Sequence, residues 1–321
     1  MLKLVLPVFI IALLNAEIAG AAAASPKYPV RPVRIVTGEV GGAPDIAVRV
    51  MSPSFSEALG EQIIVDNRGG GAGAIAAQTV ARASPDGHSL LFYAGALWLS
   101  PIINGTKEDL LKGLVPVSFV ISSPNVLVVH PSVPAKTVSE LIALAKAKPG
   151  QLNYGSGGVG GSPHLAGELF KSMAGVNIVR VGYKGGGPAV NDLLGGQLQL
   201  MFASSASVGP YISSGRLRAI AVTSPQPSAL APGLPTVAAS GLPGFETQGI
   251  YAMFAPQGTP RAVIDQVQQQ TRQIVMRNSV KEKLLSIGLE SVGSTAEQLA
   301  TVLKEEMARW GKLFREIGPQ Q

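Results

Sequence analysis

The chain has 321 residues, of which 46% are hydrophobic, and a formal net charge of +6 at pH 7. This length allows two domains that each bury a core, and 24 Pro and 38 Gly are too few to indicate a disordered chain. The absence of cysteine excludes disulfides, thiolate metal sites and a cysteine nucleophile. The basic residues are scattered and lack interleaved aromatics, which argues against a nucleic-acid surface.

The first residues are typical of a secretory signal peptide. Lys3 precedes the apolar run 4–14, and small residues form A-x-A cleavage sites that end at Ala21 or Ala24. The apolar run is too short to span a bilayer, and no later run reaches the roughly 18 residues that a membrane helix needs. We therefore expect residues 1–24 to be a signal peptide and the mature protein to be exported and soluble. An uncleaved anchor is the alternative, because Glu17 is unusual in such a segment.

Strands and helices alternate in the first third of the chain. The β-branched run 34–37 leads into a glycine-rich loop and then a helical pattern that Pro53 should kink or split. The apolar runs 62–66 and 89–93 predict two further strands, with a second glycine loop and a helix of small residues between them. This order predicts a parallel sheet covered by helices, with ligands at the carboxyl ends of the strands.

A second alternating series indicates a second lobe. The apolar segments 115–121 and 126–129 predict a crossing, and strands and helices then alternate from about 152 to 223. The Pro- and Gly-rich run 224–245 reads as an ordered connection back. A strand and helices complete the chain, the last helix being capped by Ser294 with Glu297 at its third position. Two such series predict two lobes with a cleft between them.

The stretch that organises the second lobe is LNYGSGGVGGSPHLAGELF, residues 152–170. Its glycines allow backbone N–H groups to turn toward a ligand, and the helix that opens at Pro163 and His164 presents the positive end of its dipole. This pattern predicts an anion-binding loop. The loop offers amides and hydroxyls but only His164 as a titratable group, which favours binding over catalysis.

Three other kinds of site fit this stretch less well. GSGGVG matches the dinucleotide motif GxGxxG, but the acid expected about 20 residues later is missing. His164 with Ser156 or Ser162 would suggest a hydrolase, yet no GxSxG elbow or orienting acid accompanies them. The three histidines of the chain are not clustered, so metal binding is not expected. We expect neither a cofactor nor a metal.

Two charged residues beside the glycine loops each allow two interpretations. Asp45 lies in the first turn of a helix, where it either contacts a ligand or balances the helix dipole. Lys184 precedes three glycines and either meets an anion across the cleft or is a solvated turn residue.

Eight blocks of the chain, in order, resemble the extracytoplasmic solute receptors of the tripartite tricarboxylate transporters, the Bug-type receptors. The blocks are YPVRPVRIV, VGGAPDIAVR, DNRGGGAGAIAAQTVARASPDGHSLL, LNYGSGGVGGSPHLAGELFKSMAGV, VGYKGGGPAVNDLLGGQLQLMF, GRLRAIAVTS, LPTVAASGLPGF and MFAPQGTP. The resemblance covers essentially the whole mature chain. It implies a periplasmic α/β protein with the two-lobe, type II binding-protein clamshell, each lobe a mostly parallel sheet flanked by helices. Such a protein closes on a small ligand, often a carboxylate, and delivers it to a membrane permease.

The resemblance also implies the domain division and the site. We expect a first lobe of residues 25–122 and 224–321, a second lobe of residues 123–223, and hinges near 121–126 and 222–226, in a monomeric protein. The binding loops fall on 37–45 and 156–164, with further contacts at strand ends. The implied ligand-binding residues are Thr37, Gly38, Glu39, Gly41, Gly42, Asp45, Ala94, Ser156, Gly157, Gly158, Ser162, His164, Tyr183, Lys184, Ala203 and Ser204.

The chain departs from the family pattern at three places. Thr37 and Gly38 stand where Pro and an aromatic usually follow the first strand, and Glu39 adds an acid to that loop. Ala203 stands where an Asp commonly follows the Met-Phe pair, and the usual Asp-Pro motif after the third strand is absent. Because an acid at the pocket would repel a carboxylate, Glu39 either points away or faces inward and selects an ammonium or hydroxyl group. The alternative to a receptor is an exported hydrolase or isomerase that uses His164 and a loop serine.

Overall fold

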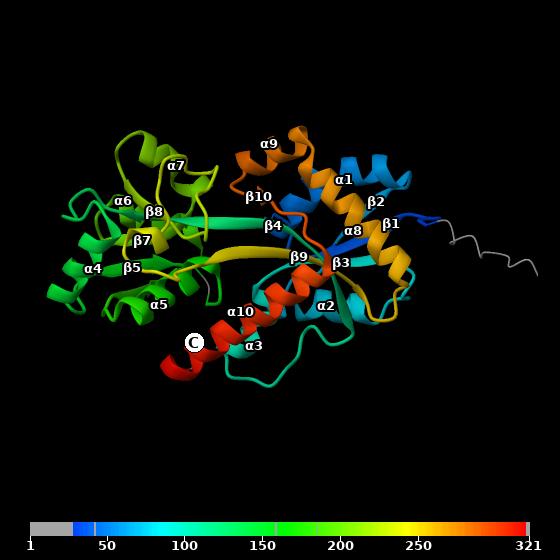
Figure 1. Cartoon of the computed structure of the whole chain (residues 1–321), viewed down its shortest axis with the longest axis horizontal. Helices are drawn as coiled ribbons and strands as arrows, with labels where there is room; N and C mark the ends of the chain where they lie inside the picture. The colour runs from blue at the N-terminus through cyan, green and yellow to red at the C-terminus, as the bar shows by residue number, and fades with distance from the viewer. Residues whose placement is uncertain (1–27, 42, 158, 184, 319–321) are drawn as a thin grey trace, which may run out of the picture.

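The computed structural model describes residues 28–318 except Gly42, Gly158 and Lys184, so the predicted signal peptide lies outside the described residues. Figure 1 shows two lobes side by side, with the long strands β4 (Leu114–Val129) and β9 (Gln248–Pro256) running between them. Both lobes are built from strands that alternate with helices, as the hydrophobic pattern predicted. No helix in the described part of the chain is both long and apolar enough to cross a bilayer.

In the described residues the first lobe is a six-stranded sheet with helices on both faces, in which the short strand β10 (Glu290–Ser291) pairs with β4. Its strand order is β2 (Ile63–Asn67), β1 (Val33–Thr37), β3 (Ser89–Ala94), β9 and β4, and the first three strands are parallel. One face packs against α1 (Ala43–Leu59), α8 (Arg261–Met276) and α9 (Asn278–Ser286). The other face packs against α2 (Ala74–Ala81), α3 (Ala96–Ile103) and α10 (Ala296–Ile317). Pro53 lies inside α1, which is assigned as one helix.

The second lobe repeats this arrangement around the far half of β4. The strand order continues with β7 (Leu200–Ser204), β5 (Asn153–Ser156) and β6 (Val179–Gly182), and β8 (Arg218–Val222) also pairs with β4. The helices α4 (Val138–Ala147) and α5 (Ser162–Ala174) cover one face. The helices α6 (Gly186–Leu194) and α7 (Ser205–Ser213) cover the other. The α/β fold with two lobes is therefore confirmed.

Strand β4 belongs to both sheets. It is 16 residues long, and its apolar side chains are buried almost throughout. Residues 114–124 pair with β9, whereas 125–129 pair with β7 and β8. The polar residues Ser122–Asn125, which separate the two apolar segments in the sequence, lie within this unbroken strand.

The register along β4 fixes how the two lobes face each other. Strand β3 runs in the direction of β4 and ends at Ala94, which is level with Ile121 through Tyr251 of β9. Strand β7 runs in the opposite direction and ends at Ser204, which pairs with Asn125. From Ile121 to Asn125 an extended strand spans about 13 Å. The carboxyl ends of the parallel strands of the two lobes therefore point toward one another across this short distance.

The connection after β8 stays with the second lobe for most of its length. The N–H of Val237 donates to the Val222 carbonyl, and the Ser139 hydroxyl on α4 donates to the Ser240 carbonyl. The chain then joins the first lobe at β9. The connection also contacts first-lobe elements, because the Ser228 hydroxyl and the Ala229 N–H donate to Glu290 and Arg309 donates to the Glu246 carbonyl. The division at residue 223 and the hinges stay predictions.

Helix α10 begins on the first lobe and ends against the second. Its capping box is formed by Thr295 and Gln298, not by Ser294 and Glu297 as predicted. The Ser294 hydroxyl instead accepts the N–H of Phe119 on β4. Figure 1 shows α10 descending from beside β9 toward α5. At its end the ring of Phe314 stacks on His164 of α5, with 6.4 Å between the ring centroids.

Candidate functional site

The first glycine loop begins where β1 ends and is closed by Asp45. Thr37 and Gly38 are buried, and no described residue hydrogen-bonds to the Thr37 hydroxyl. The N–H of Gly41 donates to Oδ2 of Asp45 at 2.9 Å. Gly42 lies outside the described residues. The loop is thus fastened to the first turn of α1.

The Asp45 carboxylate accepts hydrogen bonds from groups within the first lobe. Its Oδ1 accepts hydrogen bonds from Asn67 Nδ2 and Arg49 Nε, each at 2.9 Å, and the residue is 2% exposed. Burial by itself would raise the pKa of Asp45, but the hydrogen bonds from Gly41, Asn67 and Arg49 lower it. Of the two interpretations, these contacts favour a structural role for Asp45.

Tyr93, which the sequence did not single out, lies over both glycine loops of the first lobe. A Cβ on Gly73, where φ is +101°, would lie 2.5 Å from its ring, and a Cβ on Gly38 would lie 3.4 Å away. The predicted residue Ala94 follows it and is half-buried. Burial raises the pKa of Tyr93, and the charge of Glu39 raises it further. The Tyr93 hydroxyl lies 3.5 Å from a Cβ position on Gly38, the residue that precedes Glu39.

Arg180 lies under the glycine loop of the second lobe. Its Nε donates to the Ser156 hydroxyl at 2.8 Å, and one terminal nitrogen donates to the Gly157 carbonyl at 3.1 Å. Arg180 is half-buried and forms no ion pair with any described residue. Gly158 lies outside the described residues. Arg180 is absent from the predicted ligand-binding residues, although a charge within a strand, as in VRVG, is a signal that could have identified it.

Ser162 is tied to the crossing strand. The Nδ2 of Asn125 on β4 donates to its hydroxyl at 2.5 Å, and Asn125 is 2% exposed. The start of α5 is therefore positioned by the same strand that joins the lobes. Asn125 was also missed, because its partner lies 37 residues away in the sequence.

His164 lies in the first turn of α5. It is fully buried, and its Nδ1 accepts the N–H of Gly160 at 3.1 Å. Burial, helped by the charge of Arg180, lowers the pKa of His164 to about 4. The ring is therefore neutral at pH 7, with the proton on Nε2. Since the hydroxyls of Ser156 and Ser162 bond to Arg180 and Asn125, neither of these two serines pairs with His164.

The remaining predicted residues lie at the other strand ends of the second lobe. The Tyr183 hydroxyl donates to Asp192 at 2.7 Å, and burial and this carboxylate raise its pKa to about 12. Ala203 is buried in β7, and the Ser204 hydroxyl bonds to Ser207 at 3.0 Å. Lys184 lies outside the described residues. The described part of the chain contains no group of three acidic or histidine side chains that could hold a metal ion.

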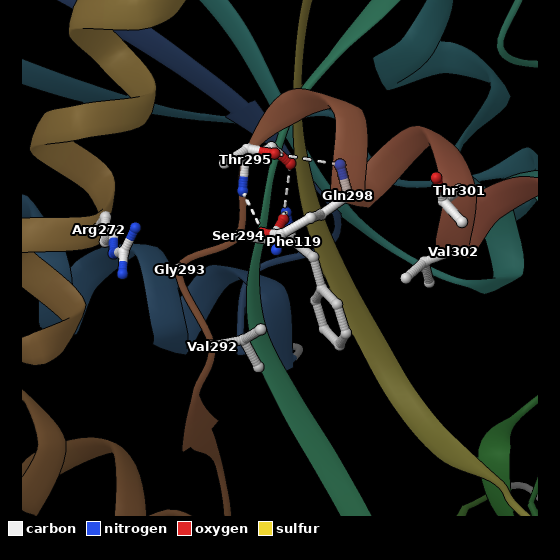
Figure 2. A pocket seen from close by; sticks show the side chains of 9 residues that line it. All are labelled: Phe119, Arg272, Val292, Gly293, Ser294, Thr295, Gln298, Thr301 and Val302. Carbon is white, nitrogen blue, oxygen red and sulfur yellow. Dashed lines mark hydrogen bonds between the residues drawn. The ribbon is translucent and has the colours of Figure 1, made fainter.

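A separate hollow of about 620 Å³ lies on the first lobe, between α8, β4 and the start of α10. Figure 2 shows Arg272 on one side and Phe119 and Val302 on the other. The polar groups at its edge already bond to one another through the Thr295 capping box and Ser294. None of the predicted ligand-binding residues lines this hollow.

The geometry has the parts of a binding site: two sets of glycine loops on opposed strand ends, with a guanidinium that has no acidic partner. Residues 47–319 match the family model described as "Tripartite tricarboxylate transporter family receptor", or TctC. The chain belongs to this family. The Bordetella pertussis protein BugT is 33% identical over 317 residues, which cover 96% of this receptor and 97% of BugT.

Two solved structures extend the comparison. An R. palustris protein solved with adipate is 31% identical and has a TM-score of 0.72, covering 90% of this receptor and 97% of that chain. A TctC solute binding protein from Polaromonas, solved with no ligand, is 26% identical and has a TM-score of 0.81, covering 90% and 99%. The receptor family and the fold of a periplasmic solute-binding protein, expected from the eight sequence blocks, are confirmed.

Proposed function

We propose that this receptor captures a small organic carboxylate between its lobes and delivers it to a tripartite tricarboxylate-type membrane transporter. The observation that carries the proposal is the unpaired guanidinium of Arg180 at the strand ends that face the first lobe. A half-buried cation without an acidic partner is a natural anchor for an anion.

The glycine loops supply the rest of the proposed anion site. The proposed donors to the carboxylate are backbone N–H groups of the loops 37–41 and 157–161 other than those of Gly41 and Gly160, which already donate to Asp45 and His164. The dipole at the start of α5 supports them. Asp45, His164 and Tyr183 support these loops through their contacts with Gly41, Gly160 and Gly155. In this proposal they position the site without touching the ligand.

We infer that the described arrangement is the open one. The TM-score is higher with the ligand-free Polaromonas structure, at 0.81, than with the adipate structure, at 0.72, although the sequence identity is lower, at 26% against 31%. Closure would then bring the first-lobe loops onto an anion held by the second lobe. Only the closed form would complete the donor set, so a ligand would select it.

The test measures carboxylate binding by the purified mature chain. Thermal shift against mono-, di- and tricarboxylates should identify ligands that raise the melting temperature, because a ligand that binds only the folded state stabilises it by mass action. Titration calorimetry should then show that Arg180→Gln weakens the best ligand by about 10- to 100-fold, the value of one charge-assisted hydrogen bond.

The matched control is Arg216→Gln, at the far edge of the same lobe, where the guanidinium lies over the Tyr211 ring. This variant should bind like the wild type. Equal binding by the Arg180 and Arg216 variants would refute the assigned anchor, and no response to any carboxylate would refute the carboxylate receptor.

Export and delivery are proposed from the family. A periplasmic protein should be recovered from the periplasmic fraction with residues 1–24 removed, which N-terminal sequencing of the mature chain would check. Deleting the gene should abolish uptake of the identified ligand by whole cells. We also propose that the receptor is a monomer and that it binds without catalysis. Incubation with the receptor should therefore leave the ligand chemically unchanged.

A further inference from the structure

Glu39 places an unpaired negative charge at the carboxyl edge of the first-lobe sheet. It follows the end of β1 by two residues, and β2 and β3 flank β1 in the sheet. Its side chain lies over Gly69, where any Cβ would overlap the Glu39 Cγ. Burial and then the charge of Glu39 raise the pKa of Tyr93, which lies at the end of β3. Glu39 is exposed and forms no hydrogen bond or ion pair with any residue that the structure describes.

Arg180 places the opposite charge at the facing edge of the second lobe. Its guanidinium lies over the ends of β5 and β6, because it bonds to Ser156 and Gly157 and lies 3.6 Å from a Cβ position on Gly182. Two other acids at the same edge of the first-lobe sheet are already paired, Asp45 with Arg49 and Asp66 with Arg68. Among the residues that the structure describes, Glu39 and Arg180 are thus charges of opposite sign at the two facing edges that have no ionic partner.

These two charges do not pair with each other in the described arrangement. They lie at facing edges, where the ends of β3 and β7 are separated by about 13 Å along β4. A ligand that fills this space would remove water from both. A buried charge is costly unless a partner compensates it. A ligand with one charge of each sign would compensate both.

We propose that the ligand is a zwitterionic amino carboxylate, whose carboxylate binds Arg180 while its protonated amine binds the Glu39 carboxylate beside the Tyr93 hydroxyl. This inference rests on the receptor function proposed above and specifies its ligand class. A dicarboxylate would bring its second negative charge against Glu39, and a hydroxyl group would leave that charge uncompensated.

The experiment compares matched ligands of three to eight carbons by titration calorimetry. For each length the set contains the dicarboxylate, the monocarboxylate, and amino carboxylates with the amine at the α or the terminal carbon. The wild type should bind one amino carboxylate at least tenfold more tightly than the dicarboxylate of the same length. The monocarboxylate should fall between them, because it lacks both the attraction and the repulsion.

Glu39→Gln keeps the size of the side chain and removes its charge. It should weaken the amino carboxylate by about tenfold and strengthen the dicarboxylate by about the same factor, which reverses the preference. Glu61→Gln is the matched control, because Glu61 precedes β2 at the opposite edge of the same sheet. It should leave both affinities unchanged.

The outcomes separate the ligand class from the receptor function. If the wild type binds a dicarboxylate most tightly and Glu39→Gln does not change this, the zwitterion is refuted while the carboxylate receptor stands. If no member of the set binds, the zwitterion is refuted, and the carboxylate receptor is refuted as well if no tricarboxylate raises the melting temperature. Reversal of the preference by Glu39→Gln, with no effect of Glu61→Gln, supports the assignment of the amine to Glu39.

Discussion

Burial of neutral His164 makes the stability of the receptor depend on pH in a defined window. The pKa of His164 is lowered from 6.5 to about 4 in the folded protein. Between these values the unfolded chain binds a proton that the folded protein does not, so acidification favours unfolding. Two to three pKa units at about 1.4 kcal/mol each amount to about 3 kcal/mol. This contribution to the free energy of unfolding should be present above pH 6.5 and lost as the pH falls to about 4.

Urea denaturation at a series of pH values between 4 and 7 measures this contribution. His164→Asn removes the titration while its amide oxygen can still accept the Gly160 N–H, so the variant should be less stable at pH 7 but lose less stability on acidification. The other ionisable groups are common to both proteins and cancel in the difference. His130→Asn is the control, because His130 lies at the far end of the lobe, bonded to Ser132. Parallel pH profiles for the wild type and the His164 variant would refute the reasoning.

Four further substitutions test packing and helix capping in the receptor. Gly60 has a φ of +70° and open space around it, so Gly60→Ala should lower the free energy of unfolding by about 1 kcal/mol. Gly73→Ala should lower it by more, because the added Cβ would lie 2.5 Å from the Tyr93 ring. Equal losses in urea denaturation would contradict the close contact. Phe314→Ala, at a site 4% exposed, should cost about 3–5 kcal/mol by the same assay, and a loss below 1 kcal/mol would show that α10 does not support the second lobe. Thr295→Ala removes the hydroxyl that caps α10 and should lower the free energy of unfolding in urea denaturation by about 1 kcal/mol. An unchanged free energy of unfolding would contradict the capping role.

The sequence predicted the alternation of strands and helices because each parallel strand is a short apolar run bounded by glycine turns. It also predicted that the loops before α1 and α5 gather at strand ends, since this follows from the direction of parallel strands alone. Whether the predicted residues touch a ligand stays a prediction. Three of these residues, Gly42, Gly158 and Lys184, lie outside the described residues.

The sequence could not predict contacts that depend on register between distant strands. Arg180 meets Ser156 because β5 and β6 pair in parallel with Tyr154 beside Arg180. Asn125 reaches Ser162 only because β4 continues into the second lobe. The cap of α10 was wrong by one residue, because SxxE at Ser294 and TxxQ one residue later fit the same local rule.

That error has a physical reason. The bond from Phe119 N–H to the Ser294 hydroxyl fixes Ser294 on β4, so the next residue is left to cap the helix. Local patterns describe what a segment can do alone, and a single tertiary hydrogen bond was enough to choose between two adjacent caps.

Strand β4, which the two sheets share, should couple the unfolding of the two lobes. Removing residues 125–129 would take from the second lobe the strand that pairs with both β7 and β8, and removing 114–124 would take an edge partner from β9. The sheet of each lobe is therefore incomplete without its part of β4. Heat or denaturant should therefore melt the whole receptor in one cooperative step, and fragments made by cutting within β4 should recover structure only when mixed.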